Sequence, residues 1–271
     1  VLYQSEAITY QYTSQYTMII RDNNGPGESP FTLDKLSKTL AVATYPDEDS
    51  AAQFRVYNGI DQHILLPSYE GNIDLRLNGF DNSSTVNSLE KGNFSESKNV
   101  AFGDYSVDIM LPNEESTLTQ NHLLTLTANS DKTAFFYLVE NEGEEEDDKT
   151  TIQINSLVTD NSNRVSLYDH RINIINLVDD FSVINLFFVR SNETIDTAQY
   201  FTTSRFVNPK TITLLNNSFH VYAVGTENNS KLILATLDMT LSEDSNDLYL
   251  IIEESKTTNS GYEMTMANQK S

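Results

Sequence analysis

The sequence contains no cysteine, and its 39 Asp and Glu far outnumber its 17 Lys and Arg. The absence of cysteine excludes a disulfide framework, a thiolate metal site and a cysteine nucleophile. The shortage of cations leaves a net charge of −22. This charge argues against binding to nucleic acid or to an anionic membrane surface, because both would be repelled. No apolar run approaches the ~18 residues of a membrane-spanning helix.

The motifs of the common catalytic and cofactor sites are also missing. There is no G-x-S-x-G elbow and no close pair of histidines for zinc. The stretch "GPGES" (25–29) lacks a third glycine and a following lysine, so we interpret it as a hairpin tip. We interpret the four separate histidines as strand residues, His170 in "YDH" being the one with charged neighbours: His63, His122, His170 and His220. We therefore predict no catalytic residue, no cofactor-binding residue and no enzyme.

The sequence does contain a long succession of short strand patterns. Alternating runs rich in Val, Ile, Thr, Tyr and Phe are separated by Asn, Asp, Ser and Gly, as in "NIDLRLNG" (72–79) and "VINLFFVR" (183–190). Their close spacing favours antiparallel sandwiches over βαβ units. The fold class is therefore all-β. One exception is the stretch 28–40, for which we predict a short helix.

The strand patterns repeat along the chain. Segments 5–25, 121–143 and 233–255 each hold an alternating strand, a polar turn and an aromatic-to-aliphatic strand. A further strand follows the first two, at 52–59 and 163–170. The period of about 115 residues is a domain length rather than a solenoid length.

This period predicts three parts. Residues 1–50 are the C-terminal strands of an incomplete upstream repeat, and residues 51–162 and 163–271 are complete β-sandwich repeats. We expect residues 1–50 to dock as a hairpin on the first complete repeat or to pair with another molecule. Since the chain opens on Val1, we also expect a signal, an anchor or a further region upstream.

The pattern resembles the bacterial domain-of-unknown-function family 4397. The resemblance is carried by "FRVYNG", "IDLRLNG" and "NVAFGDYSVDI" (99–109), and more weakly by "RVSLYDH" and "INLFFVR" in the second repeat, which lacks a counterpart of Gly103. It implies tandem immunoglobulin-like sandwiches on secreted or lipid-anchored bacterial proteins. The family has no established active residues, so the resemblance assigns no chemistry to this chain.

Three acidic clusters are the candidates for a metal site, two beside the predicted joints (47–50 and 159–163) and one at 177–182. Calcium loops alternate their ligands, as in D-x-[DN]-x-[DN]-G, and no cluster here has the full alternation. We interpret the clusters as solvated loops with Asx-turns, and therefore predict no cofactor, with a structural calcium ion as the alternative. The candidate ligands are Asp47, Asp49, Asp160, Asp179 and Asp180.

Two further stretches, one acidic and one rich in tyrosine, are candidates either for binding or for an ordinary structural role. The run "ENEGEEEDDKT" (140–150) connects two predicted strands and has no counterpart in the equivalent loops, so we interpret it as a self-repelling hairpin tip. Alternation in "YQYTSQY" (10–16) would place Tyr10, Tyr12 and Tyr16 on one strand face. One interpretation is that this face stacks on sugar rings or lines an interface. We favour the other, that it faces the core of a sandwich.

These observations favour a non-enzymatic extracytoplasmic protein that serves as a binding, adhesion or spacer module. The expected location is the periplasm, the outer membrane through an anchor, or the medium. The expected partner is a protein or carbohydrate ligand, without nucleic acid and without a membrane span in this chain. The alternative is an enzyme, or the accessory module of one, acting on extracellular polysaccharide.

Overall fold

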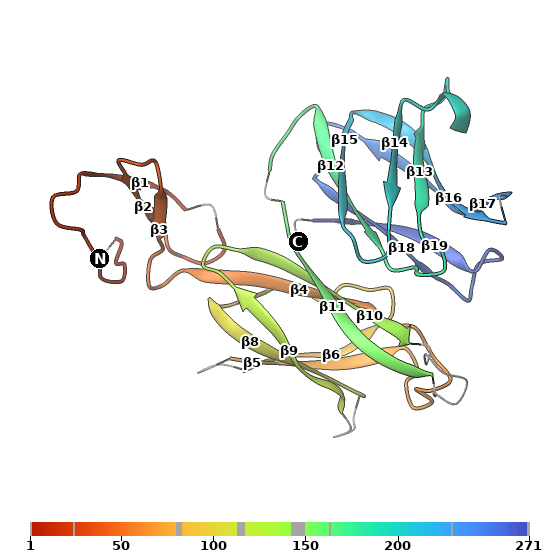
Figure 1. The fold of residues 1–271 in the computed structure, drawn as a ribbon, viewed down its shortest axis with the longest axis horizontal. Helices are drawn as coiled ribbons and strands as arrows, with labels where there is room; N and C mark the ends of the chain where they lie inside the picture. The colour runs from red at the N-terminus through yellow and green to blue at the C-terminus, as the bar shows by residue number, and fades with distance from the viewer. Residues whose placement is uncertain are drawn as a thin grey trace. The chain divides into compact units, whose positions relative to one another are not determined.

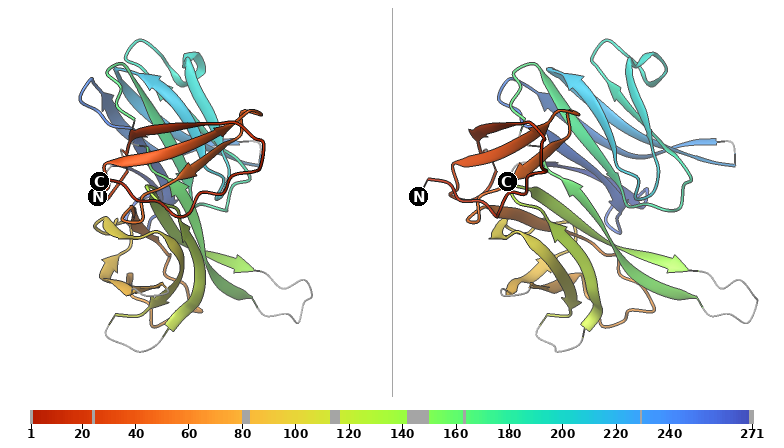
Figure 2. Two further views of the ribbon diagram at one scale, coloured as in Figure 1. Left: turned by 90° about the vertical axis from the view of Figure 1, so that its left-hand side faces the viewer. Right: turned by 60° about the vertical axis from the view of Figure 1, so that its left-hand side comes forward.

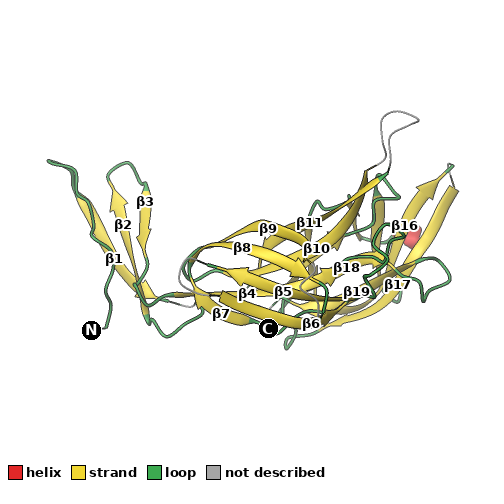
Figure 3. Cartoon of the chain, turned by 90° about the horizontal axis from the view of Figure 1, so that it is seen from below, coloured by secondary structure: helices red, strands yellow, loops and turns green. Residues whose placement is uncertain are grey.

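The computed structural model describes residues 2–23, 25–79, 83–112, 117–141, 150–162, 164–228 and 230–269. The chain divides into two compact units, Val1–Asp160 and Asn161–Ser271. Strands account for almost all of the regular structure, and the described residues contain one 3₁₀ turn (Ile195–Thr197) and no α-helix (Figures 1 and 3). The all-β, tandem-sandwich class predicted from the sequence is confirmed.

The first unit contains a β-sandwich of eight strands. Its two sheets have the orders β11-β10-β4-β7 and β6-β5-β8-β9. The strands are β4 (Ala51–Gly59), β5 (Asn72–Asn78), β6 (Ser83–Glu90), β7 (Lys98–Ala101), β8 (Gly103–Met110), β9 (Thr117–Leu126), β10 (Asp131–Asn141) and β11 (Thr151–Asp160). Alternate residues of the two sheets meet in one core, which includes Phe54, Leu75, Ile109 and Phe136.

The second unit contains a sandwich with the same architecture. Its sheets have the orders β15-β12-β18-β19 and β14-β13-β16-β17. The strands are β12 (Asp169–Asn176), β13 (Ile184–Val189), β14 (Tyr200–Ser204), β15 (Lys210–Leu215), β16 (Asn217–Glu227), β17 (Ser230–Leu241), β18 (Leu248–Glu254) and β19 (Tyr262–Asn268). Its core includes Ile174, Leu186, Phe188 and Val221, all without exposed surface. Figure 2 shows the sheets of each sandwich from two further directions.

The two sandwiches match strand for strand. β4 to β11 and β12 to β19 occupy the same places in their sheets, in the same order. In both, the first strand runs parallel to the seventh, as β4 with β10 and β12 with β18, whereas all other pairings are antiparallel. Asn58, the next-to-last residue of β4, and Asn176, the last residue of β12, each accept a hydrogen bond from the backbone amide two residues later.

The strand predicted at 163–170 is wrong. The first strand of the second sandwich begins only at Asp169, and the described part of the preceding segment is a loop. The cause is the side chain of Arg164, which turns back to bind Asp247 and Asp169. Its hydrogen bonds hold this segment in a non-extended path.

Residues before the first sandwich form a small sheet of their own (Figure 3). Its order is β1 (Tyr16–Asp22), β2 (Phe31–Ser37) and β3 (Val42–Tyr45). The helix predicted over 28–40 is therefore wrong, because β2 pairs along its whole length with β1, from Phe31 opposite Asp22 to Ser37 opposite Tyr16. Sheet pairing overrides the weak local preference for helix.

Candidate functional site

Aromatic side chains gather on the outward face of the second sandwich, on the sheet β14-β13-β16-β17. In a sandwich strand, alternate residues face the core and the others face outward. Leu186 and Phe188 of β13 are fully buried, so the intervening Phe187 faces outward. The strand register places Phe187 between Phe201 of β14 and Tyr222 of β16.

The aromatic rings form two contacting pairs, which the strand register places beside each other. The ring centroids of Phe187 and Phe201 lie 6.4 Å apart with an angle of 26° between the ring planes. The rings of His220 and Tyr222 lie 4.5 Å apart and meet edge to face. Phe201 is 64% exposed, although phenylalanine side chains are usually buried in the core. We call these four residues the aromatic face.

Polar groups border the aromatic face. Nδ1 of His220 contacts the carboxylate of Asp238 on the neighbouring strand β17. Beside this pair lies a cavity of about 430 Å³, which is also lined by Arg190 and Glu193. The Arg190 guanidinium lowers the pKa of the Glu193 carboxyl, because it donates hydrogen bonds to it. The site therefore combines flat apolar rings with hydrogen-bonding groups fixed in place.

The same face of the first sandwich has a different composition. There the register aligns Thr85 of β6, Arg76 of β5 and Asp108 of β8 in one row. Arg76 takes the place of Phe187, since it lies between the buried Leu75 and Leu77. An outward aromatic row is therefore not a requirement of this architecture. Of the two sandwiches, only the second has this outward aromatic row.

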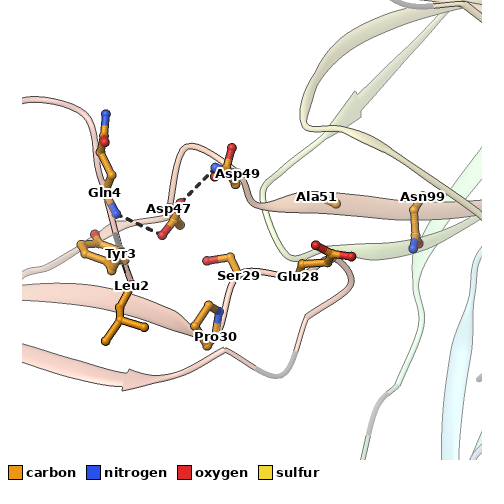
Figure 4. A pocket seen from close by; sticks show the side chains of 11 residues that line it. Leu2, Tyr3, Gln4, Glu28, Ser29, Pro30, Asp47, Asp49, Ala51 and Asn99 are labelled. Carbon is orange, nitrogen blue, oxygen red and sulfur yellow. Dashed lines mark hydrogen bonds between the residues drawn. The ribbon is translucent and has the colours of Figure 1, made fainter.

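The first predicted joint, at Asp47 and Asp49, lies beside a cavity of about 600 Å³ (Figure 4). Asp47 is buried, and its two oxygens accept backbone amides, from Asp49 at 3.0 Å and from Gln4 at 3.1 Å. The hydrogen bond from the Asp49 amide is the main cause of the lowered pKa of Asp47. This carboxylate caps a turn and ties the N-terminal segment to the chain before β4.

The other predicted ligands fall into two places. Asp160 ends β11 and is exposed, and its Oδ1 lies 2.6 Å from Nζ of Lys132. Asp179 and Asp180 follow β12, and each offers an oxygen that lies within 4.8 Å of the other and of Glu254. The structure thus brings Asp179 and Asp180 together with a third carboxylate that the sequence patterns did not nominate.

Tyr262 of β19 lies beside these three carboxylates. Its hydroxyl donates a hydrogen bond to Oδ2 of Asp180 at 2.5 Å, and its ring packs edge to face on Phe181. Burial raises the pKa of the Tyr262 hydroxyl far above its ordinary value, and the Asp180 carboxylate raises it further. Tyr262 therefore remains a hydrogen-bond donor to Asp180 at any physiological pH.

The predicted tyrosine strand at 10–16 is wrong, because β1 begins only at Tyr16. Instead, Tyr10 and Tyr16 meet edge to face at 5.6 Å. The ammonium of Lys35 lies 4.9 Å from the ring centroid of Tyr16 and 5.4 Å from those of Tyr10 and Tyr45. Tyr12, at 95% exposure, takes no part.

Two remaining predictions concern His170 and the acidic run. His170 is buried on β12, and its Nε2 lies 2.7 Å from Oδ1 of Asn216. This buried contact gives His170 a role in packing and pairing within the fold. Positions 142–149 of the acidic run lie outside the described residues.

The aromatic face was missed by the reading of single strand patterns. Phe187 lies within "INLFFV", where four apolar residues in a row hide the alternation. Alignment with the equivalent "IDLRLN" of the first repeat carries the missing signal, because a charged residue there marks the position as outward-facing.

Strand order and outward faces together define the chain as a tandem β-sandwich protein. No protein-family model matches it, and no curated protein matches it. No helix of the described residues has the length and apolar character to cross a membrane.

Among solved structures, the chain is similar to a leucine-rich repeat protein from Bacteroides thetaiotaomicron, with 8% identity over 75% of this chain and a TM-score of 0.23. It is also similar to the Bacillus anthracis TIE protein, with 8% identity over 89% of this chain and a TM-score of 0.24. The chain spans 26% and 48% of these two proteins. A DUF3823 family protein from Bacteroides ovatus matches over its full length and 71% of this chain, with 9% identity and a TM-score of 0.22.

Proposed function

We propose that this chain is a non-enzymatic binding module of an extracytoplasmic protein, with the aromatic face as its ligand-binding surface. The observation that carries the proposal is the contrast between the two sandwiches. At equivalent outward positions, one has Arg76 and Asp108, whereas the other has Phe187 and Tyr222. Exposed aromatic surface is costly in water, so its presence in one repeat only favours a role in binding.

The ligand class that suits this surface is a neutral polysaccharide. A sugar ring has an apolar face that packs on aromatic rings and an edge of hydroxyl groups that exchanges hydrogen bonds with groups such as His220 and Asp238. Further hydroxyl and amide groups lie in the neighbouring row, on Asn185 and Thr203. The net charge of −22 disfavours acidic polymers.

Catalysis of glycoside cleavage makes a different demand. It needs two carboxyl groups facing each other at roughly 5–10 Å across a cleft. The two carboxyl groups in the cavity beside the aromatic face are each paired with a basic side chain, Asp238 with His220 and Glu193 with Arg190. This arrangement supports holding a polymer rather than cutting it. The extracytoplasmic location is supported by the cysteine-free composition and by the resemblance noted in the sequence.

Affinity electrophoresis in gels containing neutral xylan, mannan or β-glucan tests this proposal. We expect at least one of these polymers to retard the chain, and Phe201→Ser and Tyr222→Ser to abolish the retardation. Arg76→Ser, at the equivalent outward position of the first sandwich, is the matched control and should be retarded like the parent. Equal retardation of the parent and the Phe201 and Tyr222 variants, or retardation by none of the polymers, would overturn the proposal.

A further inference from the structure

The cavity beside the aromatic face lies to one side of a row of rings. Phe187 lies opposite Phe201 on one neighbouring strand and opposite Tyr222 on the other, so the three rings form a row across the sheet. Neighbouring strands are about 5 Å apart, and the row therefore spans roughly 10 Å. In another row Val189 lies opposite His220, two residues or about 7 Å further along the strands. Both residues line the cavity of about 430 Å³, which we call the side cavity.

The loop after β13 contributes a fixed ion pair to the side cavity. Both oxygens of Glu193 accept hydrogen bonds from Arg190, one from its backbone amide at 3.1 Å and one from its Nε at 3.1 Å. The Arg190 guanidinium also donates to the side chain of Gln199 at 2.6 Å and lies 5.7 Å from the ring centroid of Tyr200. The Glu193 side chain is only 6% exposed. These contacts hold both groups in place without a ligand, so little further ordering is needed on binding.

Strands β16 and β17 supply the other hydrogen-bonding groups of the side cavity. Ser218 lies opposite Thr240, and their hydroxyl groups are 3.0 Å apart. Asp238 lies beside His220 and contributes a negative charge, whereas the positive charge of Arg190 is neutralised by its partner. A lining of this kind has hydroxyl, carboxylate and guanidinium groups but no surplus of positive charge. It therefore suits a neutral group that carries several hydroxyls.

We propose that the side cavity binds a single neutral sugar residue that branches from a polysaccharide backbone lying along the row of rings. This inference rests on the proposed function and specifies its ligand as a branched polymer. A backbone that follows the row passes about 7 Å from Val189 and His220, so a residue attached to its side reaches the cavity. Ligand sites have volumes of about 300–1,000 Å³, and 430 Å³ is at the lower end of this range. The side cavity thus has room for one small ring rather than for a second length of polymer.

The branch residue contributes affinity through hydrogen bonds. Its hydroxyl groups accept from the Arg190 guanidinium and donate to the carboxylate of Asp238, both of which line the side cavity. Two hydrogen bonds of ordinary net strength correspond to about a tenfold change in the dissociation constant. We therefore expect the chain to prefer a branched polymer about tenfold over the same backbone without branches.

Affinity electrophoresis with pairs of polymers tests this inference. Galactomannan, arabinoxylan and xyloglucan are each compared with the same backbone after enzymatic removal of the side residues. We expect at least one branched polymer to bind about tenfold more tightly than its debranched backbone. Thr240→Phe fills the side cavity but leaves the row of rings, and should reduce this ratio to about one. Thr213→Phe, at an exposed strand position on the other sheet, is the matched control and should keep the ratio.

A second variant removes a hydrogen-bonding group without filling the side cavity. The side chain of Asp238 is 89% exposed, so Asp238→Ala should leave the melting temperature unchanged. It should lower the preference for the branched polymer about threefold, since one hydrogen bond is lost.

The outcomes distinguish this inference from the proposed function. Equal binding of branched and debranched polymers that Phe201→Ser abolishes would overturn the branch site and leave the proposed function standing. A tenfold preference that persists in both Thr240→Phe and Asp238→Ala would also overturn the assignment to the side cavity. Retardation by none of the polymers would overturn the proposed function and this inference together.

Discussion

Arg164 binds the buried carboxylate of Asp247 and the half-buried carboxylate of Asp169 with one guanidinium group. Its Nη2 lies 3.1 Å from Oδ1 of Asp247, and its Nη1 lies 2.9 Å from Oδ2 of Asp169. Asp247 also accepts the backbone amide of Arg171 at 2.8 Å and the hydroxyl of Ser162 at 2.5 Å. This network fastens the segment before β12 to the residue that precedes β18.

The first prediction is that this network makes the second sandwich sensitive to acid. Burial alone would raise the pKa of Asp247, but the hydrogen bonds from Arg164, Ser162 and the Arg171 amide outweigh it and lower the pKa. The unfolded value is about 3.9. Stability from this carboxylate is thus complete above that value and is lost as the pH falls through the lower folded pKa.

Calorimetry between pH 7 and pH 3 measures this effect. Asp247→Asn should lower the free energy of unfolding of the second unit by about 1–3 kcal/mol at pH 7, because it weakens the hydrogen bonds of a buried group. It should also flatten the dependence on acid. Asp160→Asn breaks an exposed pair with Lys132 and should cost less than about 1 kcal/mol. An acid slope identical in the parent and Asp247→Asn would contradict the assignment.

The second prediction concerns Asn129, which joins the small sheet to the first sandwich. Its Oδ1 accepts the side-chain amide of Asn23 at 2.7 Å, and its backbone has a left-handed φ of 63°. Gly25 packs so closely against it that a Cβ there would lie 2.4 Å from Cβ of Asn129. We expect Asn129→Gly to loosen the small sheet and to speed proteolytic cleavage at 23–30.

Asn129→Ala should loosen the sheet and also strain the backbone by about 1–2 kcal/mol, since alanine disfavours a left-handed φ. Asn228→Gly, at another left-handed position, is the control for the glycine substitution and should leave cleavage unchanged. Unchanged cleavage of Asn129→Gly would refute the joining role.

The third prediction is that Lys35 holds the N-terminal segment against the small sheet. Its ammonium lies among the rings of Tyr10, Tyr16 and Tyr45 and donates a hydrogen bond to the carbonyl of Thr9 at 2.7 Å. Lys35→Met keeps the stem but removes the charge and the donor. Hydrogen exchange over residues 8–15 should then become faster. Lys38→Met, outside the ring cluster, should leave the exchange unchanged.

The fourth prediction is that the chain needs no calcium ion. The carboxylate of Asp47 already accepts two backbone amides, and that of Asp160 pairs with Lys132. We expect EDTA and added calcium to leave both melting transitions unchanged. A rise in the second transition with calcium that is lost in Asp180→Asn would contradict this and would identify Asp179, Asp180 and Glu254 as a metal site.

The strands and their tandem arrangement could be predicted from the sequence. Alternation gave the strands, and the repeat gave the tandem arrangement, because both depend on local pattern. The pairing of β4 with β10 could not be predicted, since it joins segments far apart in the chain. The loop at 164–168 has the pattern of a strand, and the fold brings Asp247 to Arg164, a partner that no local pattern shows.

The candidate site was less predictable than the fold. The acidic residues attracted attention through their charge, but Asp47 is a turn cap and Asp160 is an exposed ion-pair partner. Phe187 and Tyr222 were hidden because aromatic residues on strands normally fill the core. Only the register with Phe201 shows that they share the outward face.

The parallel pairing of first and seventh strands also affects how the chain is made. Partners such as Phe54 and Lys132 are roughly 80 residues apart, so neither sandwich closes until nearly all of it has left the ribosome. Until then, β4 and β12 are apolar strands without their central partners, and such strands are prone to pair with the wrong chain. The surplus of carboxylates along the chain disfavours such pairing, because chains of like charge repel each other.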